Sequence, residues 1–534
     1  MAAVFTGEKL ERLLGKFRKF PVKRRPCSYL EGFLAEEPEF RVCILYGLRR
    51  TGKTVMMGQA LLSLTDEERA KAAWIECRAN DDMSAVYEIL DRLQEQDFKY
   101  VFIDEITLIE DFSVDSALLA DTFSPLGLRI VLAGTHSLLF SFAREKSLYD
   151  RAYTISTTNI LFDEHSAVSG DDDIRNFISS GGIFRRLSAE DQNKYLPFKD
   201  FRSTEIYDLT AIAGNIQHSL ELDYMANRFG DLAGLYNRNH LTNAICRIMN
   251  DINNNFTIRT LKEKFVNRQE GLIRAGLTGR RDLPSDLIKE LRSIFKSAEI
   301  MDGFKDKFSI LDIKPEDFGY AITESHIAQL LHYLFEMNVL GWYHRTTYYE
   351  HSVYNDEKLP LVIQPGLRFR QCEYFVEQIL NSTELKRLTL SSPEIAKLRD
   401  AMLNTIMGRI LEEVVLFEVM HSCPEDHAVF QYRDEKNHGE IDLVIYNNKE
   451  YLCSLYEIKF SDHQVRGQAK HLTDQALIDQ FCQHYGDIQE RTVLYRGPDR
   501  DGEDGVVWRN VGSFLKETAD NFPCVEPGSV CKPV

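Results

Sequence analysis

Eight consecutive residues near the start of the chain constrain its fold more than any other segment. They match the pattern G-x-x-x-x-G-K-[ST] and are Gly47, Leu48, Arg49, Arg50, Thr51, Gly52, Lys53 and Thr54. An apolar run at 42–46 precedes them, and a helical pattern at 55–64 follows. The glycines let the backbone curl so that several N–H groups face one centre, beside the positive end of the next helix. The segment therefore predicts a strand, a phosphate-binding loop and a helix.

Two side chains of this loop have predicted roles in binding ATP and Mg²⁺. Lys53 is placed to reach the outer phosphates, and the Thr54 hydroxyl is placed to bind the metal ion. We interpret Arg49 and Arg50 as loop and nucleotide contacts rather than catalytic groups.

Apolar runs and helical patterns alternate through residues 41–158. Further strands are predicted at 72–77, 100–103, 130–133 and 153–157, with a second helix at 83–93. This alternation predicts an α/β fold with a mainly parallel sheet that is covered by helices on both faces.

The strand predicted at 100–103 delivers two acidic residues to its carboxyl end, where ligands bind in open α/β sheets. We predict that Asp104 holds Mg²⁺, directly or through water, and that Glu105 polarises the attacking water. The alternative is that both carboxylates cap the next helix, which explains one acid better than two. Their place after the phosphate loop favours catalysis and a fold branch in which another strand separates the two motif strands.

Polar residues after the strand at 130–133 are further candidates. Thr135 is the first choice for contact with the γ-phosphate or the water, and Ser137 is the second, with a helix cap as the equal alternative for Ser137. Arg144 and Arg151 are candidate cations over the developing charge, in the same chain or across a subunit boundary. Surface ion pairing is the alternative for both, and a homo-oligomer is left open.

Composition excludes several classes of protein. The formal net charge of −18 weighs against a broad surface that coats nucleic acid, although it allows a local one. The ten cysteines form no C-x-x-C pair and no zinc-spaced cluster. No apolar run is long enough to cross a membrane, and the first residues lack the apolar stretch of a secretory signal. We expect a cytoplasmic protein without a membrane partner.

The segment at 9–25 is locally basic and contains Arg24 and Arg25. We interpret it as a solvated helix face, with an arm that contacts phosphate as the alternative.

Residues from about 165 to 350 are mostly helical in pattern. The segment at 326–340 has one apolar stripe and runs into 341–344 and 346–349, which are typical of a short β-hairpin. A helix followed by such a hairpin suggests a winged-helix module, and a packed helical linker is the equal alternative.

Residues 400–500 predict a second α/β domain. A helix at 402–420 precedes strands at 429–432, 441–446 and 451–459, and a helix at 475–485 precedes a strand at 491–495. Asp442 lies in the second strand, and Glu457 and Lys459 share one face of the third because side chains alternate along a strand. Two carboxylates can bind Mg²⁺ and align a phosphodiester, and the lysine can help to activate water and offset charge.

A carboxylate from the helix at 402–420 often completes a metal site of this kind. Glu412 and Glu413 are both candidates, and Gln468 and Gln475 are weaker candidates for substrate contact. The order helix Glu, hairpin Asp, then Glu-x-Lys is the layout of the PD-(D/E)xK nuclease core. Such a domain is either an active nuclease or a vestigial one that only binds or signals.

With these motifs the chain resembles the prokaryotic AAA+-like ATPases that carry a C-terminal restriction-nuclease-like PD-(D/E)xK domain. The resemblance rests on residues 47–54, 101–105, 181–182, 207–213, 408–412, 439–442 and 457–459. It implies a P-loop ATPase core at 1–165, a helical lid at 166–260, a helical or winged-helix-like spacer at 261–395 and a nuclease-like domain at 396–534. Because the middle region is longer than a simple lid, no family role is carried onto residues 215–350.

Two classes of function fit these expectations. The first is an ATP-driven enzyme that acts on DNA or RNA, which the intact Asp442, Glu457 and Lys459 favour. The second is an ATP-dependent conformational switch with an inactive nuclease-like fold, which the net charge of −18 favours. A small-molecule kinase fits less well because the domain plan offers no obvious acceptor site.

Overall fold

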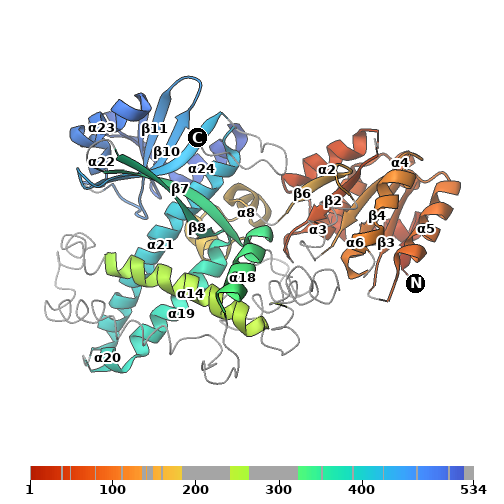
Figure 1. Ribbon diagram of the computed structural model, residues 1–534, viewed down its shortest axis with the longest axis horizontal. Coiled ribbons are helices and arrows are strands. Elements are labelled where there is room, and N and C mark those ends of the chain that lie inside the picture. Colours follow the sequence, from red (N-terminus) through yellow and green to blue (C-terminus); the bar gives the residue numbers. More distant parts are fainter. Residues whose placement is uncertain are drawn as a thin grey trace.

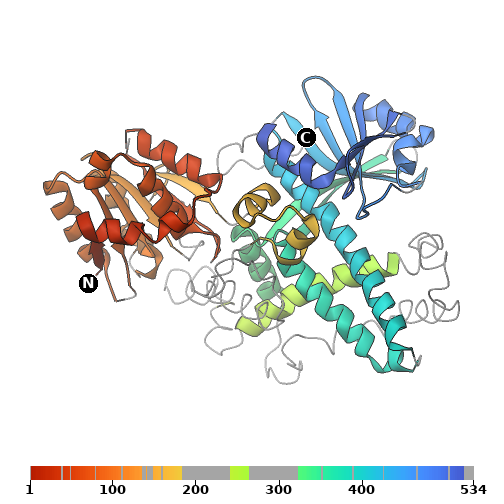
Figure 2. The ribbon, with the colours of Figure 1, turned by 180° about the vertical axis from the view of Figure 1, so that it is seen from behind.

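The structure is a computed structural model that describes the chain in three main stretches. They are residues 2–182, 241–263 and 323–521, together with residue 232, apart from short gaps at 38–39, 49, 79, 110–111, 135–139, 141–147, 158–159, 350–352, 388–389, 425, 465–466 and 503–504. The described residues form an N-terminal body, red to orange in Figure 1, and a C-terminal body that is largely green to blue. Figure 2 shows the same arrangement from behind.

The N-terminal body is built on a six-stranded sheet with the order β1-β3-β4-β5-β2-β6. The strands are β1 (Ala3–Phe5), β2 (Val42–Tyr46), β3 (Ala72–Glu76), β4 (Tyr100–Asp104), β5 (Arg129–Ala133) and β6 (Ala152–Ser156). All neighbours are parallel except β1, which pairs antiparallel with β3. Because β5 separates β2 from β4, the predicted strand between the two motif strands is confirmed.

Helices bury both faces of this sheet. One face is covered by α1 (Gly7–Leu14), η1 (Phe17–Lys19), α2 (Pro26–Ala35) and α3 (Lys53–Ser63). The other is covered by α5 (Met83–Glu95), α6 (Phe112–Asp115) and the π-helical turn η3 (Leu119–Phe123). The short α4 (Asp66–Ala70) and η2 (Ile106–Leu108) lie in the connections. Successive residues of β2 alternate between the two apolar clusters, which explains why the strand is apolar throughout.

The C-terminal body contains an eight-stranded mixed sheet with the order β13-β14-β12-β11-β10-β9-β7-β8. Its strands are β7 (Leu340–Tyr349), β8 (Val353–Val362), β9 (His427–Asp434), β10 (Gly439–Asn447), β11 (Leu452–Ile458), β12 (Asp487–Tyr495), β13 (Arg500–Asp501) and β14 (Val507–Asn510). β9, β10 and β11 form an antiparallel meander, and β12 adds parallel to β11.

The segments 341–344 and 346–349, expected to form the hairpin of a winged-helix spacer, both lie in the single strand β7 of this sheet. β7 pairs parallel with β9 and antiparallel with β8, so both strands extend the C-terminal sheet at one side. The boundary expected between residues 395 and 396 therefore divides one continuous sheet. The sequence pattern gave no sign of this, because the β7–β9 pairing joins residues more than eighty positions apart.

The helices of the C-terminal body are α8 (Phe162–Ser169), α9 (Ile174–Ser180), α14 (Leu241–Lys262), α18 (Glu324–Glu336), α19 (Pro365–Asn381), α20 (Thr383–Lys386), α21 (Ser392–Ser422), α22 (Lys470–Thr473), α23 (Gln475–Tyr485) and α24 (Val511–Asn521). Side chains of α8, α9, α14, α19 and α21 share one apolar cluster with one face of the sheet. The helices described from the range expected to form a lid thus pack into the C-terminal body. Among the described helices, none combines the length and apolar character needed to span a bilayer.

Candidate functional sites

The phosphate-binding loop lies between the carboxyl end of β2 and the start of α3, as predicted. Gly47, Arg50 and Gly52 have φ values of 143°, 67° and 88°, which curl the backbone away from an extended path. The Lys53 ammonium donates to the carbonyl oxygens of Gly47 and Leu48 at 2.7 Å and 2.8 Å. Its charge is therefore held at the mouth of the loop, where a nucleotide phosphate can replace the carbonyl oxygens. Arg49 lies outside the described residues.

The two acidic residues predicted at the end of β4 lie beside this loop. Asp104 is 7% exposed and accepts a hydrogen bond from the Thr54 side chain. Burial, together with the charge of Glu105, raises the pKa of Asp104 to about 6, against the opposing effects of Thr54 and Lys53. Glu105 follows with a φ of 55°, and its N–H donates to Asp104 Oδ1 at 3.1 Å. The structure thus brings together Lys53, Thr54, Asp104 and Glu105, which are four of the predicted ATP-site residues.

This donor set fits a magnesium ion. A hydroxyl and a carboxylate are hard oxygen ligands, and Mg²⁺ is usually held by few protein groups, with water and phosphate filling its other positions. Burial disfavours the charged form of the Asp104 carboxylate, and its raised pKa reflects this cost. A bound cation would favour the charged form. Thr54 and Asp104 would hold the ion.

Of the later candidates, Thr135, Ser137 and Arg144 lie outside the described residues. Arg151 is described, and its position contradicts a role in its own ATP site. It directly precedes β6 at the amino end of the parallel sheet, where the Val42 N–H donates to its carbonyl oxygen at 3.0 Å. The phosphate loop follows the carboxyl end of β2, one strand length away. The Arg151 guanidinium instead pairs with Asp121 at 2.8 Å, so the expectation of action in cis is wrong.

Arg24 is a residue of the ATP site that the sequence interpretation missed. Its side chain is 4% exposed and donates to the backbone carbonyl oxygen of Thr51 in the phosphate loop at 2.6 Å. It also pairs with Glu164 of α8 at 2.7 Å. The interpretation of residues 9–25 as a solvated face is therefore wrong at Arg24. Its partner lies 140 positions away, so local charge could not identify it.

The second candidate site lies on β10 and β11. The Ile458 N–H donates to Asp442 Oδ2 at 2.8 Å, and the Lys459 ammonium lies 2.9 Å from the same oxygen. The ammonium also contacts Glu457. Burial lowers the pKa of Lys459, but Asp442 and Glu457 outweigh this effect and raise it above its ordinary value. Lys459 is therefore a cation at neutral pH, clamped between two carboxylates.

Helix α21 contributes one carboxylate to this cluster, and it is Glu412 rather than Glu413. Burial raises the pKa of Glu412 to about 8, with opposing effects of Arg409 and Lys459 and a further rise from Asp442. Glu413 points elsewhere and pairs with Arg368 of α19 at 2.8 Å. The weaker candidates bond locally: Gln468 donates to Ser461 at 3.1 Å and Gln475 to Asp479 at 2.6 Å.

His471 is a further member of this cluster that the sequence interpretation missed. Its Nδ1 lies 2.8 Å from Glu457 Oε1, and this hydrogen bond raises the pKa of His471. His471 lies on the short α22, after the Glu-x-Lys motif, where no spacing rule draws attention to it.

The predicted metal ligands of this site are not arranged to bind an ion. Within the described part of the chain, no group of three or more His, Cys, Asp and Glu side chains has a geometry that could hold one. The expectation that Glu412, Asp442 and Glu457 form such a group is therefore not met. The physical reason is the Lys459 ammonium, which contacts both strand carboxylates from the position between them.

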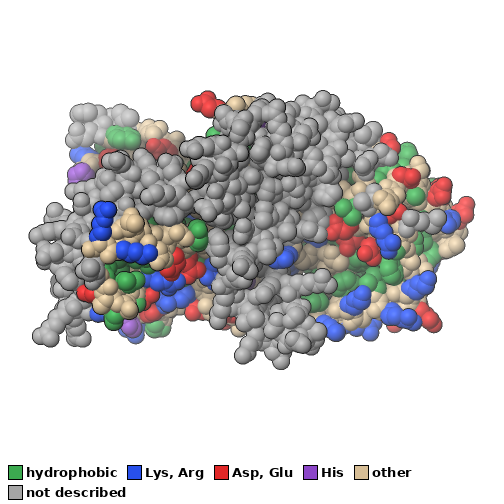
Figure 3. All heavy atoms as spheres, turned by 90° about the horizontal axis from the view of Figure 1, so that it is seen from below, with side chains coloured by type: hydrophobic (Ala, Val, Ile, Leu, Met, Phe, Trp, Pro, Cys, Tyr) green, Lys and Arg blue, Asp and Glu red, His purple; other side chains and the backbone are tan. Residues whose placement is uncertain are grey.

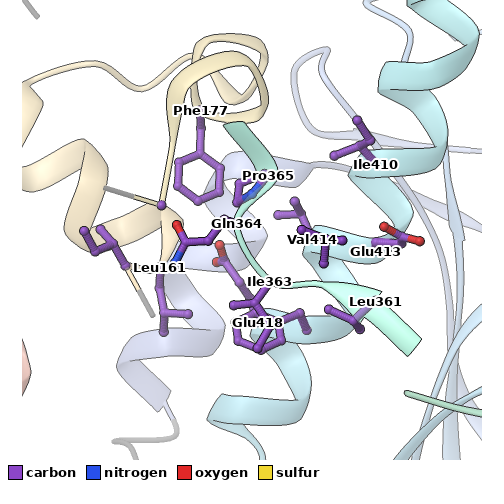
Figure 4. Close-up of a pocket in the computed structure, with 14 residues that line it drawn as sticks. Leu161, Phe177, Leu361, Ile363, Gln364, Pro365, Ile410, Glu413, Val414 and Glu418 are labelled. Atoms are coloured by element: carbon purple, nitrogen blue, oxygen red, sulfur yellow. The ribbon is translucent and has the colours of Figure 1, made fainter. Parts of the chain in front are cut away.

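Among the described residues, neither the face shown in Figure 3 nor the cavity shown in Figure 4 points to a third site. On the face shown in Figure 3, basic and acidic side chains are interspersed over the described part of the N-terminal body. A cavity of about 20 Å³ lies between α9, α21 and residues 361–365, and Figure 4 shows Phe177 and Val414 in its wall. This volume holds about one water molecule and is far too small for a nucleotide.

Comparison with known proteins agrees with the geometry of the first site. Residues 39–166 match the family model described as an AAA domain. They include the phosphate loop and the strand that ends in Asp104. No curated protein matches the chain. A solved structure, that of PCH-2 from C. elegans, matches with 14% sequence identity over 36% of this chain and 59% of that chain, with a TM-score of 0.21. So low a score carries no weight for the fold.

The N-terminal body therefore has the fold of a P-loop nucleotide-binding domain, and most of it is similar to the AAA domain family. The match ends at residue 166, within α8, and includes no later part of the C-terminal body.

Proposed function

We propose that this protein hydrolyses ATP at the N-terminal site with the help of Mg²⁺. The observation that supports this most directly is the contact between Thr54 and Asp104, which joins the two nucleotide motifs at one point. Lys53 contacts the outer phosphates, and Glu105 orients water for attack on the γ-phosphate. A magnesium ion held by Thr54 and Asp104 would offset charge that develops on the phosphate oxygens. Water then displaces ADP, and the γ-phosphate leaves as inorganic phosphate.

We further propose that the ATPase domain is coupled to a nuclease-like domain that acts on DNA or RNA. The supporting observation is the buried cluster of Asp442, Glu457 and Lys459 on adjacent strands, flanked by Glu412 of α21. The Lys459 ammonium is a cation that can pair with a phosphate of the nucleic-acid backbone. To do so, it must break its contact with Asp442 or Glu457.

A second candidate is an ATP-dependent switch whose nuclease-like fold is inactive. One observation favours it: among the described residues, no three potential ligands are arranged to hold a metal ion. In this account the ion pairs of Lys459 with Asp442 and Glu457 are a permanent structural feature of the sheet.

Cleavage assays separate the two candidates. The wild-type protein would be incubated with linear and circular DNA and with RNA, with Mg²⁺ or Mn²⁺, and with and without ATP. Lys459→Ala and Asp442→Asn test the cluster. Lys449→Ala is the matched control, since Lys449 is a lysine of the same domain that is 75% exposed and pairs with Asp426 at 2.8 Å.

The nuclease account predicts cleavage that falls about a hundredfold or more in Lys459→Ala and is unchanged in Lys449→Ala. Absence of cleavage on every substrate, with ATP still hydrolysed, would reject it in favour of the switch. A folded Lys459→Ala variant that cuts at the wild-type rate would show that another site is responsible.

A further inference from the structure

A buried ion pair lies directly behind the phosphate loop. Arg24 precedes α2, and Glu164 is in the first turn of α8. Their side chains are 4% and 3% exposed. An arginine is rarely buried to this degree unless each partner is compensated, because removing a charge from water is costly.

The contacts of the pair are directed at the loop. Arg24 Nη1 donates to the Thr51 carbonyl oxygen at 2.6 Å and to the Thr157 carbonyl oxygen at 2.8 Å. Arg24 Nη2 donates to Glu164 Oε2 at 2.7 Å, and Glu164 Oε1 accepts from the Arg25 N–H at 2.7 Å. Glu164 thus fixes the guanidinium, and the guanidinium fixes the loop.

Thr51, which accepts the hydrogen bond from Arg24, also contacts other parts of the loop. Its hydroxyl donates to the Leu48 carbonyl oxygen at 2.9 Å and lies 2.8 Å from the Thr157 hydroxyl. The Thr157 N–H in turn donates to Tyr46 O at 2.8 Å, at the end of β2. Both ends of the loop backbone are therefore held from behind, which leaves the N–H groups of its inner side for a ligand.

We propose that Arg24, oriented by Glu164, is a positioning residue of the phosphate loop that fixes the conformation competent for ATP. The proposal rests on the proposed ATP binding at this loop. Arg24 acts through the Thr51 carbonyl and does not touch the nucleotide. The planar fork of arginine reaches three acceptors at once, which the single ammonium of a lysine cannot reproduce.

The test measures the Kd for Mg-ATP by calorimetry, and kcat and KM for hydrolysis, in the full chain. Arg24→Lys keeps the charge, and Glu164→Gln keeps the shape of the partner. Arg368→Lys is the matched control, because Arg368 forms an equally buried pair with Glu413 at 2.8 Å within the C-terminal body. Circular dichroism establishes that each variant is folded at the assay temperature.

We expect Arg24→Lys to raise the Kd roughly tenfold or more, as for the loss of a charge-assisted hydrogen bond. Glu164→Gln should raise it by a smaller factor, and Arg368→Lys should leave it unchanged even if it lowers the unfolding temperature. Wild-type affinity in folded Arg24→Lys would overturn the proposal and leave ATP binding intact. If the wild type binds no more Mg-ATP than Lys53→Ala, the proposed function fails, and this proposal fails with it.

Discussion

Each candidate site contains a lysine, the buried Lys53 and the partly exposed Lys459, and the partners of these two lysines differ. Lys53 donates to the neutral carbonyl oxygens of Gly47 and Leu48, which an incoming phosphate can replace at little electrostatic cost. Lys459 is held by the charged Asp442 and Glu457, which bind it far more strongly. The first site is therefore prepared for an anion, whereas the second must rearrange before its lysine is available.

A single histidine predicts part of the pH dependence of stability. His165 of α8 is 5% exposed and packs against the Phe177 ring at 5.2 Å. Burial lowers the pKa of His165 to about 4, although Asp171 opposes the shift. Because the folded state binds this proton less readily than the unfolded state, the stabilisation is complete above about pH 6.5 and is lost as the pH falls towards 4.

The matched measurement is the free energy of unfolding in urea at pH 7.5 and pH 5 for wild type and His165→Leu. The wild type should lose about 2 kcal/mol more than the variant between pH 7.5 and pH 5. Equal pH dependence in the two proteins would show that His165 does not titrate as a buried group.

At the level of elements, α8 is one of the elements through which the two bodies are in contact. Its first N–H, that of Phe162, donates to Glu418 Oε1 of α21 at 2.8 Å. Burial raises the pKa of the Glu418 carboxyl group well above its ordinary value. On the other side, Glu164 of the same helix binds Arg24 behind the phosphate loop.

Replacing Glu418 tests the contribution of this contact. Glu418→Ala leaves the Phe162 N–H buried without an acceptor and should lower the free energy of unfolding by about 1–3 kcal/mol. Glu418→Gln keeps an acceptor oxygen for the Phe162 N–H, so it should be close to wild type. Chemical denaturation at pH 7 distinguishes them, and equal losses in the two variants would contradict the assigned hydrogen bond.

The individual strands show how much of the fold the sequence patterns could predict. The core strands β2 to β6 were predicted within one or two residues, because a strand buried on both faces is apolar throughout and the motifs lie at strand ends. The hairpin predicted at 341–344 and 346–349 is wrong, because both segments belong to the single strand β7, whose partners β8 and β9 follow later in the chain. Arg24 and His471 escaped notice because their roles depend on long-range packing rather than on a local pattern.

For the whole molecule, the described contacts form a continuous connection between the two sites. It runs from the phosphate loop through Arg24 and Glu164 to α8, and from Phe162 to Glu418 on α21. Glu412 lies six residues earlier on α21, about 9 Å along the helix axis. Lys516 of α24 also reaches Asp172, close after α8, at 2.7 Å. These contacts place α8 between the phosphate loop and α21.

The most direct test of this account is ATP hydrolysis by the purified full chain, with Mg²⁺ and after its removal by EDTA. Wild type would be compared with Lys53→Ala, Glu105→Gln and the surface control Arg18→Ala, since Arg18 is 59% exposed and pairs only with Glu11 among the contacts described. The account predicts Mg²⁺-dependent hydrolysis that falls about a hundredfold or more in the first two variants and is unchanged in the third. Hydrolysis that persists in Lys53→Ala at the wild-type rate, or is absent from the wild type, would contradict it.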